Sequence, residues 1–172
     1  MTDDTVELAT LLHRTLRARG ETLAVAESLT GGGLGAALTA VPGVSEWFRG
    51  GVTAYATDLK TTLLGVDGEL LERVGPVAAE VARQMATGVR ERLSATYGLA
   101  TTGVAGPDAQ GARPPGEVHV ALAAPHGCTS RSLHVPGARD RVRAEAVRAA
   151  LALALEVVPG DGEARSMITA LH

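Results

Sequence analysis

The sequence predicts an α/β fold in which helices flank a mixed β-sheet. Segments with helical spacing of apolar residues alternate with short apolar runs along the 172 residues, which is the pattern of strands covered by helices. Hydrophobic residues make up 45% of the chain but aromatic residues only 2%, so Ala, Val and Leu must fill the core. Such small side chains suit closely packed layers of helix and sheet.

The N-terminal part of the chain is expected to form a helix, a strand and a second helix. Apolar residues recur at helical spacing at Val6, Ala9, Leu12 and Leu16. Because Gly20 follows them, where a helix C-terminus favours glycine, the first helix should span about residues 3–19. The apolar run at 22–26 predicts a buried strand. Glycines 31–33 then lead into a helix over 34–39.

A second strand and two further helices follow. Residues 51–56 predict a strand that carries Tyr55. Thr57 is a suitable cap for the short helix that bears Lys60. The next helix, over about residues 77–94, has an apolar face formed by Val77, Val81, Met85 and Val89.

The C-terminal part predicts a third strand, a hairpin and a long helix. Residues 99–102 form the strand, and the polar loop 108–115 separates it from an apolar run at 118–123. A tight turn and a further strand up to Val135 complete the hairpin. The Ala- and Leu-rich segment 138–158 is the last helix. The hairpin makes the sheet a mixed one.

Length and composition indicate one domain over residues 1–158, followed by a tail of uncertain order at 159–172. A net charge of −3 without a basic block argues against a nucleic-acid surface. Cys128 is alone, so no internal disulfide is possible. The acidic N-terminus lacks a signal-peptide pattern and no stretch is long enough to span a bilayer. We therefore expect a cytoplasmic protein.

Lys60 is the one lysine among sixteen cationic residues, and the other fifteen are arginines. Lysine can lose its proton inside a protein and act as a base, whereas arginine cannot. The count by itself is also compatible with chance survival of one lysine in an arginine-rich composition. Lys60 is therefore a candidate base that needs a partner.

Ser28 is the candidate partner, because it stands between a predicted buried strand and a glycine-rich helix start. A nucleophile there would face backbone donors from Thr30, Gly31 and Gly32; alternatively, Ser28 is only a helix cap. Ser-Lys pairs can replace a Ser-His-Asp triad when burial lowers the pKa of the amine. Tyr55 could relay a proton between them, or could simply place its hydroxyl at the sheet rim.

Three other patterns bear on the site. The run from Gly31 to Ala36 matches a dinucleotide-binding pattern only weakly, because no acidic residue closes the second strand. Arg139 and Arg143 lie one helical turn apart and could clamp a phosphate or carboxylate, or could form a solvated face. Residues 102–107 make a second glycine-rich strand exit that could line a pocket or be a turn. The five histidines show no metal-binding spacing.

Several segments together resemble the CinA C-terminal domain family, the nicotinamide mononucleotide amidohydrolases. The similarity runs in order over roughly residues 5–157. Its motifs are 26–32 (AESLTGG), 38–45 (LTAVPGVS), 50–52 with Tyr55 and Lys60, 64–66 (LGV), Val81 to Gly88, 102–107 (TGVAGP), and Gly137 with Arg139 and Arg143. The ordered series is far more specific than any single motif.

The resemblance implies a three-layer α/β sandwich and an amidase that converts nicotinamide mononucleotide to nicotinic acid mononucleotide and ammonia in pyridine nucleotide salvage. It implies Ser28 as nucleophile, Lys60 as base and Tyr55 as their partner, with no cofactor and no metal. It also implies a homodimer or larger homo-oligomer. From the charge and composition we expect no direct nucleic-acid partner and no membrane partner. We expect substrate contacts from Glu27, Thr30, Gly31, Gly32, Gly103, Gly106, Arg139 and Arg143.

The sequence departs from the family pattern at two places near these residues. Leu29 replaces a usual cysteine, and Ala56-Thr57 replace a usual Ser-Asn pair. These changes bear on substrate preference and turnover. A nucleotide-binding or regulatory domain with weak catalysis, linked to competence or DNA damage, is the alternative hypothesis.

Overall fold

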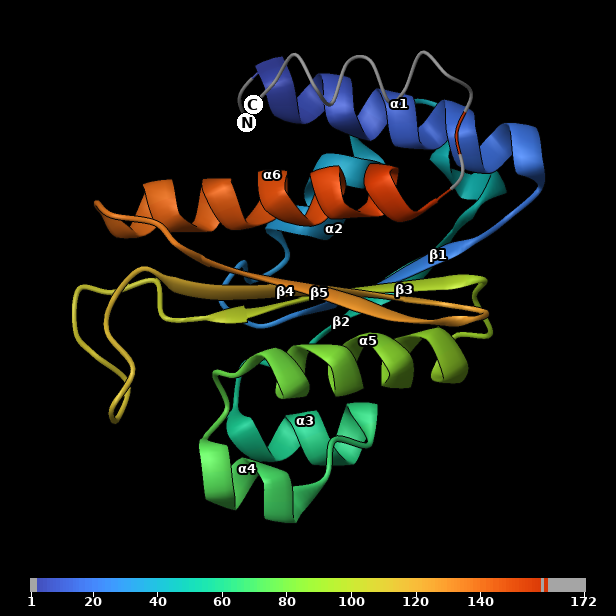
Figure 1. Ribbon diagram of the computed structural model, residues 1–172. Coiled ribbons are helices and arrows are strands. Elements are labelled where there is room, and N and C mark those ends of the chain that lie inside the picture. Colours follow the sequence, from blue (N-terminus) through green and yellow to red (C-terminus); the bar gives the residue numbers. More distant parts are fainter. Residues whose placement is uncertain (1–2, 159, 161–172) are drawn as a thin grey trace.

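A five-stranded mixed sheet lies between two layers of helices in the computed structural model, which describes residues 3–158 and 160 (Figure 1). The strands are β1 (Leu23–Glu27), β2 (Phe48–Thr53), β3 (Tyr97–Gly103), β4 (Glu117–Ala124) and β5 (Gly127–His134). The helices are α1 (Asp3–Arg19), α2 (Gly33–Thr39), the 3-10 turn η1 (Val44–Glu46), α3 (Thr57–Leu64), α4 (Gly68–Val74), α5 (Ala79–Arg92) and α6 (Arg139–Val157). The predicted α/β sandwich with a mixed sheet flanked by helices is confirmed.

The strand order β2-β1-β3-β4-β5 determines where loops gather. Strands β2, β1 and β3 are parallel, and β4 and β5 continue the sheet as an antiparallel hairpin. The carboxyl ends of the three parallel strands therefore meet at one edge of the sheet. In open α/β sheets this edge is where ligands bind.

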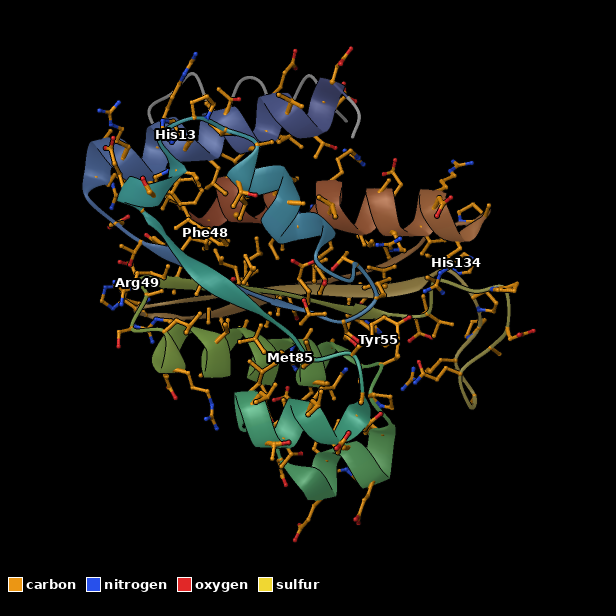
Figure 2. All side chains as sticks on the ribbon, turned by 180° about the vertical axis from the view of Figure 1, so that it is seen from behind. His13, Phe48, Arg49, Tyr55, Met85 and His134 are labelled. Atoms are coloured by element: carbon orange, nitrogen blue, oxygen red, sulfur yellow. The ribbon has the colours of Figure 1, made fainter. Side chains whose placement is uncertain are left out.

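Each face of the sheet has its own apolar core. Helices α1, α2 and α6 cover one face, and α5 covers the other with α3 and α4 below it (Figure 1). Successive residues of β1 point to opposite faces, so Val25 belongs to the first core while Ala24 and Ala26 belong to the second. In Figure 2, Phe48 lies on the α1 side of the sheet and Met85 on the α5 side.

Glycines let the second layer approach closely, which explains the scarcity of large side chains. A Cβ at Gly98 on β3 would lie 2.0 Å from the carbonyl oxygen of Ala86 on α5. A Cβ at Gly88 on α5 would lie 1.8 Å from the carbonyl oxygen of Leu64 at the end of α3. Only glycine fits at these two contacts, so α3 is held tightly against α5.

Some predicted boundaries differ from the observed ones. Strand β2 ends at Thr53, so Tyr55 lies in the connection to α3 and not in the strand. Helix α4 has no counterpart among the helices predicted from the sequence. Its N-terminus is capped by the Asp67 side chain, which accepts from the N–H of Glu69 at 2.9 Å. The predicted tail at 159–172 lies outside the described residues, except for residue 160.

Candidate active site

Ser28 and Lys60 are joined by a hydrogen bond at the edge of the sheet. Ser28 directly follows β1, and its N–H donates to the carbonyl of Thr101 on β3 at 3.0 Å. The Lys60 Nζ donates to Ser28 Oγ at 2.9 Å and to the carbonyl of Ala54 at 2.8 Å. The sequence-predicted pair is thus brought together from two elements 32 residues apart.

Lys60 is almost completely buried, with 1% of its surface exposed. Burial disfavours the charged form of an amine and lowers the Lys60 pKa from 10.5 to about 8. A neutral amine can accept the hydroxyl proton of Ser28 across the 2.9 Å contact. The arrangement can therefore activate a serine nucleophile near neutral pH.

Glu27 supports the turn that carries Ser28. Its side chain is 2% exposed. One carboxyl oxygen accepts from the N–H groups of Gly32 and Leu34, both at 3.0 Å, and the other accepts from Gly35 at 2.8 Å. The expectation that Glu27 contacts substrate is therefore corrected, because its carboxyl group is turned into the start of α2.

Two of the three predicted oxyanion donors also need correction. The N–H of Gly31 donates to the carbonyl of Ser28 at 3.1 Å, and that of Gly32 donates to Glu27. Thr30 is fully buried, and its hydroxyl is bonded to that of Thr101 at 2.8 Å. The Gly31 and Gly32 N–H groups thus build the turn, whereas the Thr30 N–H makes no hydrogen bond within the described residues. With its glycine N–H groups engaged, the turn cannot cradle a dinucleotide phosphate either.

Tyr55 and Arg139 form a polar bridge near the pair. Tyr55 lies just beyond β2 at the start of the chain leading into α3 (Figure 2). Its hydroxyl accepts from an Arg139 Nη at 2.9 Å, and the other Nη of Arg139 donates to the carbonyl of Gly106 at 3.0 Å. Tyr55 is 56% exposed, so its hydroxyl is accessible to a ligand.

A pocket of about 180 Å³ connects these groups. It is lined by Ser28, Leu29, Tyr55, Lys60, Pro76, Val77, Thr102, Gly103, Val104, Ala105, Gly106, Asp108, Gln110 and Arg139. The reactive pair, Tyr55, Arg139 and the second glycine-rich strand exit thus share one cavity. Of the predicted substrate contacts, Gly103, Gly106 and Arg139 line it.

The comparisons with known proteins agree with this architecture. Residues 5–158 match the model of the CinA C-terminal domain. The chain belongs to the CinA C-terminal domain family. A CinA-like protein of Frankia casuarinae is 54% identical over 142 residues, which are 83% of this chain and 33% of that protein. The chain thus spans about one third of the length of the curated relatives it matches.

Solved CinA structures share the fold. The competence/damage inducible protein CihA of Agrobacterium tumefaciens superposes with a TM-score of 0.88 at 33% identity, covering 91% of this chain and 96% of that one. A CinA superfamily protein of Escherichia coli gives 0.85 at 36% identity, covering 90% and 93%.

Arg143 does not join Arg139 in the pocket of this CinA-family chain. Its Nη2 donates to the carbonyl of Thr30 at 2.8 Å, and it lines a different cavity beside α2. The two guanidinium groups therefore do not bind one anion together, as the sequence had suggested. Arg143, one helical turn further along α6 than Arg139, reaches the back of the Ser28 turn instead.

The pocket also contains residues for which the sequence predicts only turns and loops. Asp108 and Gln110 come from the polar loop that the sequence predicts at residues 108–115. Thr102 donates to the carbonyl of Pro76 at 2.8 Å. The sequence does give one signal that Asp108 belongs to the site. It is a polar residue directly after a glycine-rich strand exit.

Other reactive groups do not compete with this site. The described residues contain no group of three or more His, Cys, Asp or Glu side chains that could hold a metal ion. Burial raises the pKa of the Cys128 thiol, which makes it a weaker nucleophile at neutral pH. No helix within residues 3–158 has the length and apolar character that crossing a bilayer requires.

Proposed function

We propose that this chain is an amidohydrolase that converts nicotinamide mononucleotide to nicotinic acid mononucleotide and ammonia. The observation that carries the proposal is the buried lysine at 2.9 Å from a serine hydroxyl, inside a pocket. The family resemblance supplies the substrate, and a role in pyridine nucleotide salvage follows from it. The chemistry requires no cofactor.

The first half of the reaction is acylation of Ser28. The neutral Lys60 amine takes the hydroxyl proton while Ser28 Oγ attacks the carboxamide carbon. The tetrahedral intermediate then collapses, the carbon–nitrogen bond breaks, and the Lys60 ammonium gives its proton to the leaving nitrogen, which departs as ammonia. In the second half, the Lys60 amine, which is neutral again, activates a water molecule. This water attacks the ester on Ser28 and releases nicotinic acid mononucleotide.

The developing oxyanion requires donors other than the Gly31 and Gly32 N–H groups. Leu29 lines the pocket directly after Ser28, and its backbone N–H donates no hydrogen bond among the described residues. A donor adjacent to the nucleophile is well placed for an oxyanion. We assign this role to the Leu29 N–H, while Tyr55 and Arg139 form the polar wall of the pocket.

Ammonia release from nicotinamide mononucleotide tests the proposal. The unmodified protein should release ammonia, and Ser28→Ala should lower the rate by at least about 1000-fold, because among the described residues Ser28 carries the one hydroxyl that is hydrogen-bonded to the Lys60 amine. Ser45→Ala, at an exposed serine of η1, is the matched control and should leave the rate unchanged. Tight binding of the mononucleotide without ammonia release by the unmodified protein would instead support the regulatory alternative.

A further inference from the structure

A second cavity, of about 550 Å³, adjoins the pocket that holds Ser28 and Lys60. The two cavities share Pro76 and Gln110 in their linings, so a ligand can extend from one into the other. The second cavity is formed by the end of α4 with residues 75–76 on one side and the loop residues 110–113 on the other. Its position makes it an extension of the proposed substrate site.

Two arginines give this second cavity a positive character. Arg73, in the last turn of α4, is exposed and makes no ion pair or side-chain hydrogen bond within the described chain. Arg113 donates to Glu117 at 2.9 Å, and the same Glu117 oxygen is bonded to His119 at 2.9 Å. Arg113 keeps 38% of its side chain exposed, so its other N–H groups are available. The cavity lining thus contains two arginines and one carboxyl group, and that carboxyl group is bonded to Arg113 and His119.

The loop holds Arg113 at this position. Gln110 and Arg113 exchange two backbone hydrogen bonds of 3.0 and 3.1 Å, which close a small hairpin. Gln110 thereby stands at the junction of the two cavities, with Arg113 on the far side of the turn. The Arg113 guanidinium is held in place by this backbone turn and by its ion pair with Glu117.

The other cations near the pocket already have partners. Arg143 is bonded to the carbonyl of Thr30, outside the pocket. Arg139 bridges Tyr55 and Gly106, and Lys60 is buried against Ser28. A substrate held with its carboxamide at Ser28 therefore finds, in the second cavity, Arg73 without a side-chain partner in the described chain and Arg113 with part of its guanidinium exposed. Asp108, which lines the first pocket, can accept from sugar hydroxyls between the two ends.

We propose that Arg73 and Arg113 bind the phosphate group of a mononucleotide whose base end lies at Ser28. This assignment rests on the proposed function and adds to it the part of the chain that selects a phosphorylated substrate. Guanidinium groups suit this role because they donate several N–H bonds to phosphate oxygens.

Calorimetric binding of nicotinamide mononucleotide and of nicotinamide riboside, which lacks the phosphate, tests the assignment. The Ser28→Ala protein is used so that no turnover interferes. Adding Arg73→Gln or Arg113→Gln should weaken mononucleotide binding by roughly ten-fold each, the effect of one charge-assisted contact, and leave riboside binding unchanged. Arg113→Lys, which keeps a cation beside Glu117, should weaken it less than Arg113→Gln. Arg14→Gln, at an exposed arginine of α1, is the control.

The two proposals fail in different ways. Equal weakening of both compounds, no weakening, or no preference for the mononucleotide overturns the phosphate site, whatever the ammonia assay gives. An arginine-dependent preference for the mononucleotide upholds the phosphate site even if the unmodified protein releases no ammonia, in which case only the proposed hydrolysis is wrong.

Discussion

Lys60 connects the unusual composition of the chain to its proposed chemistry. A buried amine with a pKa near 8, against an ordinary value of 10.5, is about 3 kcal/mol easier to deprotonate than an exposed one. At pH 7 about a tenth of the molecules then carry a neutral amine. Arginine in the same place would remain charged. The lone lysine can therefore serve as a base, which the fifteen arginines cannot.

The pH dependence of hydrolysis follows from this pKa. Because the neutral amine is the active base and burial lowers its pKa, kcat/KM should rise with pH from 6 and level off above about 8. Initial rates of ammonia release between pH 6 and 10 measure the profile. A profile that is flat over this range, or that falls as pH rises through 8, would show that Lys60 is not the base.

At the scale of the element, the turn after β1 depends on Glu27. Glu27→Ala leaves the N–H groups at the start of α2 without their acceptor and should destabilise the protein by about 2–4 kcal/mol. Urea unfolding measures the change. Glu72→Ala, at an exposed position of α4, should change stability by less than about 0.5 kcal/mol. Similar values for the two variants would refute the supporting role of Glu27.

The contact between α3 and α5 depends on Gly88. Gly88→Ala would place a methyl group 1.8 Å from the carbonyl oxygen of Leu64, so α3, which carries Lys60, must move. We expect a loss of at least about 3 kcal/mol in the free energy of unfolding. Gly68→Ala is the matched control, because nothing lies within 4 Å of a Cβ there; helix propensity should make it neutral or slightly stabilising. Equal thermal midpoints for the two variants would contradict this packing.

Local patterns predicted the elements better than their tertiary contacts. Apolar spacing followed by Gly20 identified α1 with its observed limits, and the Ser28–Lys60 pair followed from residue types and motif order. The direction of a polar side chain could not be predicted in this way. Glu27 turns into the start of α2 and Arg143 reaches Thr30 because of packing between elements that are distant in sequence. α4 is short, and its cap and two leucines gave a weak signal.

At the scale of the whole molecule, sheet topology assembles the site. The parallel order of β2, β1 and β3 brings Tyr55, Ser28 and Gly103 to one edge, and the first residue of α6 adds Arg139. All of these residues belong to this chain, although it spans about one third of the length of its curated relatives. The groups that the proposed chemistry uses therefore all come from this one chain.

The most direct test of the central claim is ammonia release from nicotinamide mononucleotide by Lys60→Arg, measured beside the unmodified protein at pH 8. Arginine keeps a positive charge but cannot accept the Ser28 proton. The rate should therefore fall by at least about 100-fold, the usual contribution of a general base, while circular dichroism and mononucleotide binding show a folded protein. A folded Lys60→Arg variant that releases ammonia at a rate close to that of the unmodified protein would contradict the account.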